Sequence, residues 1–155
     1  MQTAMQKNIG IVIGVTLLLY GLLRIGVGSL LLSQYLGWLD VPALQDATQD
    51  VGTFLAKSVD QQFIAVSVPA YLGYVAMMGL VLAAGAIRTL QDQSFGLRLI
   101  AIYLLMYAML FINFQTVNPK VIHLALCTVL FAVLCWFKQT PRMTSSTQLS
   151  AGSAA

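Results

Sequence analysis

Four long apolar runs dominate the sequence, and most polar residues lie between or beyond them. The runs cover residues 9–32, 68–87, 97–114 and 121–137. Each is close to the roughly 17–25 residues that an α-helix needs to cross about 30 Å of hydrocarbon. They lack the two-residue alternation of a membrane β-barrel, and a backbone exposed to lipid must otherwise be helical. The pattern therefore predicts an all-α integral membrane protein built as a four-transmembrane-helix bundle.

The first run also resembles a secretory signal peptide, because Lys7 precedes an apolar stretch. However, Arg24 interrupts that stretch and no Ala-x-Ala-like cleavage site follows closely. We therefore expect the first run to be retained as a span. Cleavage, the alternative, would leave three spans and reverse the location of the N-terminus.

The connection after the first run predicts an additional helix of different character. Between Pro42 and Lys57, apolar residues recur at helical spacing on one stripe, which consists of Leu44, Ala47, Val51, Phe54 and Leu55. The remaining positions are largely polar and acidic. We predict an amphipathic helix over residues 42–57, capped by Asp40. It lies on the outer end of the bundle as a lid, or, alternatively, anchors the loop in the membrane interface.

The basic residues predict the orientation of the bundle. One side of the membrane receives Lys7, Arg88, Arg98, Lys138 and Arg142, and the opposite side receives Lys57 and Lys120 with most of the acids. Since Lys and Arg concentrate in cytoplasmic loops, both termini are expected in the cytoplasm, in a bacterial inner (plasma) membrane. Ser94 and Asn118-Pro119 are typical helix starts. Residues 1–138 would form the membrane domain, and the polar tail at 139–155 would be disordered.

The composition supports a lipid bilayer as the main partner. The 155 residues are 59% hydrophobic and 8% charged, whereas soluble domains carry about 25% charged residues. The net charge of +3 reflects scarce acids rather than a basic run, which argues against nucleic-acid binding. There is no Cys-x-x-Cys pair, paired carboxylate, Ser-His-Asp set or Gly-rich phosphate loop. We therefore expect no catalytic residues, no metal site and no cofactor: the protein is not an enzyme.

Arg24 is the most informative single residue, because a charge inside a membrane span is costly and usually functional. If hydrocarbon begins at Ile9, about 30 Å at 1.5 Å per residue ends near residues 27–29. Arg24 would then lie about 5–8 Å below the outer boundary on that rise. From there it either snorkels to the interface or faces inward to bind an anion, a headgroup or a partner. No acid lies within any apolar run.

Other polar residues are expected near the outer half of the bundle. A tentative ligand-binding set therefore consists of Arg24, Tyr71, Tyr74, Asn113, Gln115 and His123. They would line an outward-facing pocket beneath the 42–57 helix. The alternative is an aromatic belt with ordinary polarity at helix ends. Tyr103 and Tyr107 are expected deeper, where they would hydrogen-bond between helices.

Small residues form a stripe on the first helix, which consists of Gly10, Gly14, Gly21 and Gly28. Such stripes allow a second helix to approach closely. The partner helix is either in the same chain or in another copy, so the stripe predicts intramolecular packing or a homo-oligomer seam.

Two functions are consistent with this pattern. The first is a small non-enzymatic accessory or assembly partner of a membrane complex. The second is binding or transport of a lipid, quinone-like or anionic small molecule around Arg24. The layout is similar to that of several small bacterial four-helix membrane families, including the DoxX-like group, whose first helix resembles the Arg24-x-x-x-Gly28 spacing. Here Arg24 follows fifteen residues of the run, and no second motif supports a family assignment.

Overall fold

The computed structural model describes residues 2–115 and 122–136, and within these ranges the chain is all-helical, without strands. The elements are α1 (Gln2–Tyr35), α2 (Pro42–Lys57), the short 3-10 helix η1 (Val59–Gln61), α3 (Val68–Leu90), α4 (Phe95–Phe114) and an unlabelled helix, Ile122–Trp136. Three of them, α1, α3 and α4, are long and apolar enough to cross a membrane. These three helices identify a membrane protein. The Ile122–Trp136 helix is apolar but shorter.

The spanning helices extend beyond the apolar runs from which they were predicted. α1 begins before Ile9 and continues past Leu32, α3 continues past Ile87, and α4 begins before Leu97. A helix satisfies its own backbone hydrogen bonds, so it need not stop where the hydrocarbon stops. Hydropathy marks the lipid-contacting part of each helix, and the polar flanks prolong it.

Of two helix caps predicted from the sequence, Asp40 is wrong, and Ser94 is the N-cap of α4 in position only. Val41, not Asp40, is the N-cap of α2, and the Oδ1 atom of Asp40 accepts a hydrogen bond from Gln45 Nε2 at 2.7 Å. Ser94 precedes α4, but its side chain forms no capping bond. Its φ of −60° and ψ of −24° are helical, whereas a capping serine needs extended backbone to aim its hydroxyl at the helix N–H groups. Asn118-Pro119 and the 139–155 tail lie outside the described residues.

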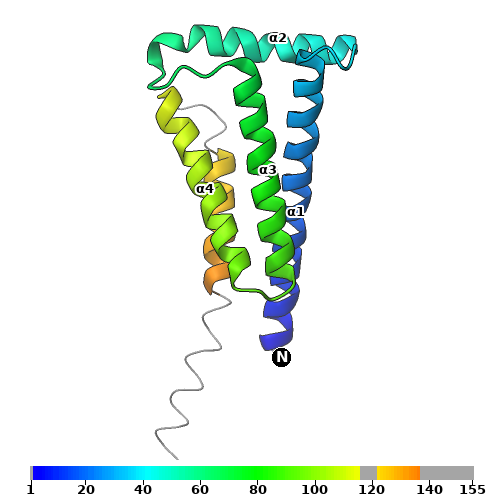
Figure 1. The fold of residues 1–155 in the computed structure, drawn as a ribbon. Coiled ribbons are helices and arrows are strands. Elements are labelled where there is room, and N and C mark those ends of the chain that lie inside the picture. Colours follow the sequence, from blue (N-terminus) through cyan, green and yellow to red (C-terminus); the bar gives the residue numbers. More distant parts are fainter. Residues whose placement is uncertain (1, 116–121, 137–155) are drawn as a thin grey trace, which may run out of the picture.

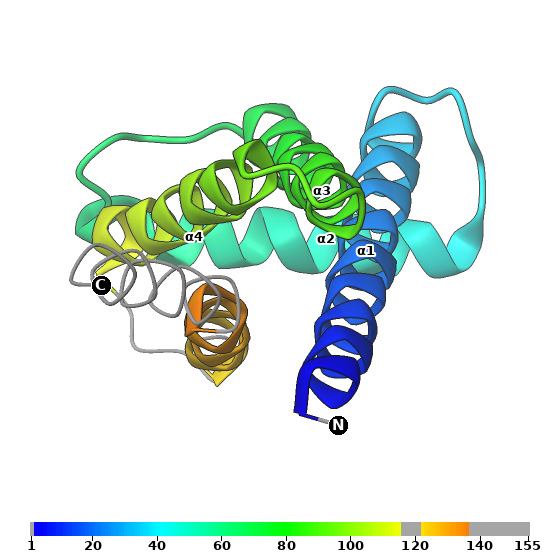
Figure 2. The same ribbon diagram turned by 90° about the horizontal axis from the view of Figure 1, so that it is seen from below.

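The three spanning helices stand side by side, and α2 crosses one end of them (Figure 1). The N-terminus and the turn between α3 and α4 lie at the opposite end. Seen from that end, α3 lies between α1 and α4 (Figure 2). The Ile122–Trp136 helix stands opposite α3, on the side where α1 and α4 are apart. That helix starts well below α2 and runs toward the end that holds the N-terminus.

α1 and α3 pack almost backbone to backbone. A methyl group placed on Gly21 would lie 2.9 Å from the backbone nitrogen of Ala83, and one on Gly28 would lie 2.9 Å from that of Ala76. On α3, a methyl group on Gly79 would lie 2.8 Å from the backbone nitrogen of Ile25. Real side chains cannot occupy such gaps, so this contact requires glycine.

The stripe expected from the sequence is therefore divided between two environments. Gly14, Gly21 and Gly28 face α3 within the chain, and the atom nearest a methyl group at Gly14 is the flexible side chain of Leu90. At Gly10, no atom of the described residues lies within 4 Å of such a group. The close approach thus accounts for three of the four glycines without a second copy.

The core follows the α1–α3 contact and draws in α4 and the Ile122–Trp136 helix. Its fully buried members include Leu17, Met78, Leu82, Ile100 and Tyr103, each at most 1% exposed. Cys127 and Leu134 bring the last helix into the same cluster. The outward faces of the helices expose large apolar side chains such as Leu19, Leu105 and Val129, as expected for surfaces that contact lipid.

We predict that Gly21→Val destabilises the protein because the valine would meet the backbone of α3. Overpacking of this kind costs about 1–3 kcal/mol, so the midpoint of thermal unfolding in detergent should fall by several degrees. Gly26→Val is the matched control, since a methyl group at Gly26 has no neighbour within 4 Å and the same change in helix propensity applies. Equal unfolding midpoints for the two variants would contradict the close α1–α3 contact.

Candidate functional site

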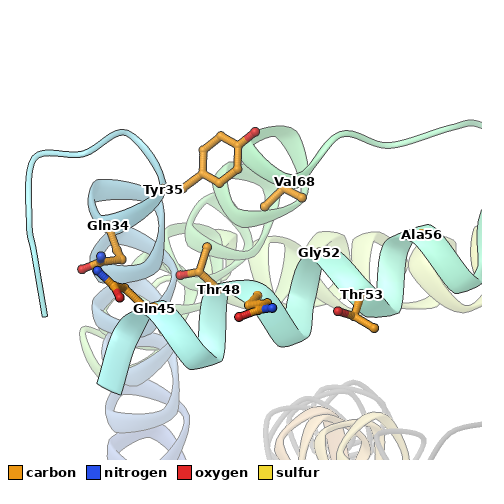
Figure 3. Close-up of a pocket in the computed structure, with 9 residues that line it drawn as sticks. Gln34, Tyr35, Gln45, Thr48, Gly52, Thr53, Ala56 and Val68 are labelled. Atoms are coloured by element: carbon orange, nitrogen blue, oxygen red, sulfur yellow. The ribbon is translucent and has the colours of Figure 1, made fainter. Parts of the chain in front are cut away.

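A groove opens at the end of the bundle that α2 crosses (Figure 3). It has a volume of about 550 Å³ and lies between the end of α1, α2 and the start of α3. Its lining consists of Gln34, Tyr35, Gln45, Thr48, Gln49, Gly52, Thr53, Ala56 and Val68. None of the residues in the predicted ligand-binding set belongs to it. The groove is lined by uncharged groups, so it offers hydrogen bonds but no electrostatic preference.

Arg24 lies at the middle of the bundle, deeper than the sequence estimate. Its neighbour Ile25 packs against Gly79, which is the central residue of the 23-residue helix α3. At 1.5 Å per residue, Gly79 is about 17 Å from either end of that helix. The count from Ile9 was misleading because α1 extends in both directions beyond the apolar run. At this level the side chain cannot reach either end of α3.

The guanidinium group of Arg24 faces the interior, where it is surrounded by three tyrosine rings. Its central carbon lies 4.3 Å from the ring centroid of Tyr107, 5.2 Å from that of Tyr20 and 5.6 Å from that of Tyr103. Nη2 donates a hydrogen bond to Tyr20 Oη at 3.3 Å, and Nη1 donates a weak one to the sulfur of Met78 at 3.8 Å. The snorkelling alternative is thus replaced by an inward-facing arginine in an aromatic cluster, which we call the Arg24 cluster: Arg24, Tyr20, Met78, Tyr103 and Tyr107.

The positive charge of this cluster has no carboxylate to neutralise it. The five acidic residues are all aspartates, and none lies in α1, α3, α4 or the Ile122–Trp136 helix. Ring faces attract a cation, each contributing about 0.5–2 kcal/mol depending on burial. They leave the net charge unchanged, however. The cluster therefore places an uncompensated cation at the centre of a membrane-spanning bundle.

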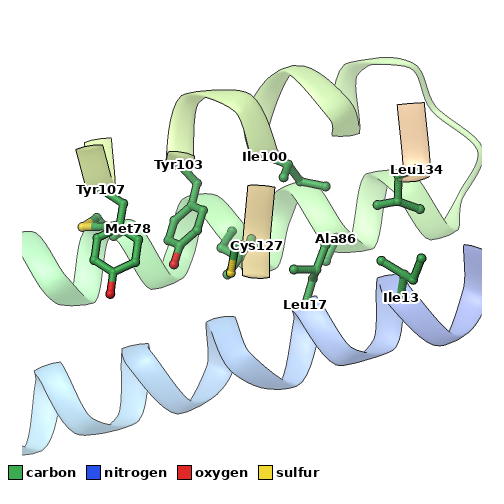
Figure 4. Packing of buried hydrophobic residues seen from close by; sticks show 10 residues of the cluster. Ile13, Leu17, Met78, Ala86, Ile100, Tyr103, Tyr107, Cys127 and Leu134 are labelled. Carbon is green, nitrogen blue, oxygen red and sulfur yellow. The ribbon is translucent and has the colours of Figure 1, made fainter. Parts of the chain in front are cut away.

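Tyr103 adds a buried hydroxyl group to the cluster. Its side chain is 0% exposed, and its Oη atom forms no hydrogen bond of standard geometry within the described residues. The thiol of Cys127, a weak hydrogen-bonding group, lies beside it. Figure 4 shows the hydroxyls of Tyr103 and Tyr107 both directed toward α1, the helix that carries Arg24. Among the described residues the ring of Tyr103 faces Arg24, and its hydroxyl has only the weakly bonding Cys127 thiol beside it.

His123 joins the edge of the cluster through Tyr20. The two rings are stacked, with centroids 6.2 Å apart and planes at 26°. His123 is exposed, whereas Tyr20 and Arg24 are each half-buried. Of the ligand-binding set expected from the sequence, His123 thus reaches the Arg24 cluster. It does so through the ring of Tyr20 and not by direct interaction with Arg24.

The remaining members of that set serve the packing of the α2 end. Tyr74 donates a hydrogen bond to the carbonyl of Met106 at 2.9 Å, which ties α3 to α4. The ring of Tyr71 packs edge-on against Phe114. Gln115 is exposed and ends α4 with a φ of 48°, in the left-handed region. These positions do not converge with Arg24 on one pocket.

Asn113 has a structural role of its own. Its Oδ1 accepts a hydrogen bond from the backbone nitrogen of Ile64 at 2.9 Å, and its Nδ2 donates one to the carbonyl of the same residue at 3.1 Å. The side chain therefore satisfies both backbone groups of one loop residue. This fastens the loop before α3 to the end of α4.

Sequence reasoning missed Tyr20 and did not connect Tyr103 and Tyr107 with Arg24. A signal existed for Tyr20, which precedes Arg24 by four residues and so lies on the same face of α1. Tyr103 and Tyr107 were recognised as one turn apart on a deep face of α4. What the sequence could not supply was the register that places this face beside Arg24.

We predict that Asn113→Ala releases the loop before α3 while leaving the Arg24 cluster intact. Both side-chain hydrogen bonds to Ile64 would be lost, at a cost of about 1–3 kcal/mol. Hydrogen–deuterium exchange of residues 62–66 should become faster in the variant. Asn113→Asp, which keeps the acceptor but not the donor, should fall between it and the wild type. Unchanged exchange in Asn113→Ala would show that this pairing does not hold the loop.

No protein-family model, curated protein or solved structure matches the chain. Its function must therefore be inferred from the chemistry of its own residues. Within the described ranges no group of three or more His, Cys, Asp or Glu residues could hold a metal ion. The cation of Arg24, with the hydroxyls around it, is the feature that carries most chemical information.

Proposed function

We propose that the protein binds a small amphiphilic molecule within the membrane, at the Arg24 cluster. The ligand class is a lipid, a quinone-like molecule or another molecule with an anionic or carbonyl head. The observation that carries this proposal is the position of Arg24, which is at mid-span, inward-facing and without a carboxylate partner in any apolar helix. A head group that accepts hydrogen bonds would complete the interactions that the protein leaves open.

The energetic balance supports a ligand. An arginine at the centre of a spanning helix costs about 2.5–3.5 kcal/mol on insertion scales. The contacts with Tyr20, Tyr103 and Tyr107 offset part of that cost, and methionine or leucine at this position would avoid it altogether. A residue with such a cost is usually retained for function. The surrounding hydroxyls suit an oxygen-bearing head, and the apolar core suits the hydrophobic remainder of an amphiphile.

The accessory or assembly role is our second candidate function. It was based largely on the glycine stripe, of which Gly14, Gly21 and Gly28 face α3 of the same chain. Gly10 and Gly26 remain open on α1 and are available to another helix. In both cases we propose a non-enzymatic protein, because the sequence has no recognisable catalytic set. Ligand binding comes first because it uses the most unusual residue of the chain.

For the membrane arrangement we propose four crossing segments, with both termini in the cytoplasm of a bacterium and α2 as an amphipathic lid on the outer surface. Lys7, Arg88 and Arg98 lie at one end of the bundle, and the acidic residues of α2 lie at the other. On α2, the predicted apolar stripe is half-buried or buried, and Gln45, Asp46, Gln49, Asp50, Thr53 and Lys57 are exposed. The described last helix is about 22 Å long at 1.5 Å per residue. Crossing there requires further residues on its flanks.

Reporter fusions test this topology. A fusion after residue 138 should read cytoplasmic, and insertions between Asp46 and Asp60 should read external, because the basic ends of the helices stay inside. A cytoplasmic signal from the α2 insertions would show that the bundle has the opposite orientation in the membrane. If both the fusion at 138 and the α2 insertions read external, the last apolar segment does not cross the membrane.

The binding proposal predicts that Arg24→Gln loses the ligand. Native mass spectrometry of protein extracted gently from its own membranes should find a retained small molecule in the wild type and none in the variant. Arg98→Gln is the matched control, because it removes the same charge from an exposed position at the end of the bundle. A folded Arg24→Gln variant with unchanged ligand content would refute the proposal. A stoichiometric second protein in all three samples would favour the accessory role.

A further inference from the structure

We infer that the ligand of the Arg24 cluster is an oxyanion attached to an apolar chain, and that the hydroxyl of Tyr103 is its second hydrogen-bond donor. This inference rests on the proposed function and narrows its ligand class. It excludes a neutral quinone-like molecule as the preferred occupant. Both a carboxylate on a fatty chain and the phosphate of a lipid head share the required chemistry.

The charge of the site favours an anion over a neutral ligand. Arg24 stands among apolar and aromatic side chains at mid-span, where the low dielectric strengthens electrostatic interactions. A carbonyl would accept a hydrogen bond but leave the positive charge uncompensated. A carboxylate or phosphate would accept the bond and also neutralise the charge. Guanidinium groups match both oxyanions with parallel N–H donors, and such bonds are stronger than neutral ones.

Tyr103 provides evidence that is independent of the charge. Its hydroxyl is fully buried, beside Arg24, and without a hydrogen bond of standard geometry in the described part of the chain. Buried polar groups nearly always have a partner, so each exception requires an explanation. A buried hydroxyl on a ring that faces the guanidinium suits an oxyanion with two acceptor oxygens. One oxygen would bind to Arg24 and the other to Tyr103.

The apolar chain follows from the route by which the site can be reached. The α2 end is closed above α3 and α4 by an aromatic group in which Phe114 contacts Phe54 at 5.4 Å and Tyr71 at 5.9 Å between ring centroids. Leu55, which follows Phe54 in the sequence, is also buried, at 4% exposure. Arg24 and Tyr20, in contrast, are half-buried away from this end, and we infer that they are reached from the side of the bundle. The lipid phase borders that side, and a molecule that arrives from it must be amphiphilic.

The test uses the full chain reconstituted in phosphatidylcholine nanodiscs, with four probes measured by competition against a labelled fatty acid. Oleate and lysophosphatidic acid supply the two oxyanions, oleyl alcohol is the neutral match of oleate, and decylubiquinone is the neutral carbonyl. We expect at least one oxyanion to bind roughly tenfold or more tightly than oleyl alcohol and decylubiquinone, since a bond to a charged group is worth about 1.5–3 kcal/mol. Whichever of oleate and lysophosphatidic acid binds more tightly shows whether the natural head group is a carboxylate or a phosphate.

The variants separate the two donors. Arg24→Gln should lose the preference for oxyanions, and Arg24→Lys should keep part of it because the charge remains. Tyr103→Phe should weaken the oxyanion roughly tenfold, as expected for one hydrogen bond to a charged group. Tyr71→Phe and Arg98→Gln are matched controls and should bind like the wild type. Thermal unfolding of each variant verifies that a lost signal is not a lost fold.

The outcomes distinguish this inference from the proposed function. Binding of decylubiquinone that depends on Arg24 and equals that of the oxyanions would overturn the anion preference and leave the proposed function standing. Oxyanion binding that is unchanged in Tyr103→Phe would overturn the second donor. If no probe binds in an Arg24-dependent manner, and native protein also carries no Arg24-dependent molecule, both the inference and the proposed function are wrong.

Discussion

The close contact between α1 and α3 determines where every other group of the bundle lies. Gly21 and Gly79 allow the two backbones to touch, and a side chain at either position would push the helices apart. Because glycines on both helices must face each other, the register between α1 and α3 has little freedom. This register sets Arg24 at the level of the middle of α3. A shift of one turn would move the guanidinium by about 5.4 Å toward an end of the span.

The aromatic surroundings of Arg24 reduce the cost of its buried charge without neutralising it. An aspartate or glutamate beside it would neutralise the charge and make the site inert toward other anions. Tyrosine rings instead stabilise the cation through their faces and remain compatible with the apolar core. Tyr103 and Tyr107 also project hydroxyls toward α1. The cluster thus lowers the free-energy cost of the buried charge but does not neutralise it. In the proposed function, an anionic ligand would neutralise the charge.

The helical architecture could be predicted from the sequence, but the site could not. Apolar length alone indicated α1, α3 and α4, and a helix spans Pro42–Lys57 where helical periodicity predicts one. Hydropathy reports which residues contact lipid but not where a helix ends, so the depth of Arg24 was underestimated from its distance to Ile9. Helix register is decided by close packing between segments distant in sequence. The rings of α4 therefore could not be assigned to Arg24 in advance.

Polarity near helix ends was misleading for a related reason. Asn113, Tyr71 and Tyr74 are polar or amphipathic residues near one level of the bundle, which suggested a shared pocket. In the structure Asn113 pairs with the loop backbone at Ile64, and Tyr74 bonds to the carbonyl of Met106. Loops and helix ends contain backbone groups without helical partners, and nearby polar side chains are used to satisfy them. Arg24 differs because no backbone group at mid-span of a helix needs its hydrogen bonds.

This difference also changes the direction from which a ligand would come. A pocket beneath α2 would collect molecules from the aqueous side, and the groove of about 550 Å³ does open there. That groove lacks charged lining residues and does not include Arg24. Phe54, Tyr71 and Phe114 close the nearby end of the bundle with ring contacts. The charge is therefore separated from the groove, and this separation is the arrangement that the proposed binding of a bilayer-dissolved ligand requires.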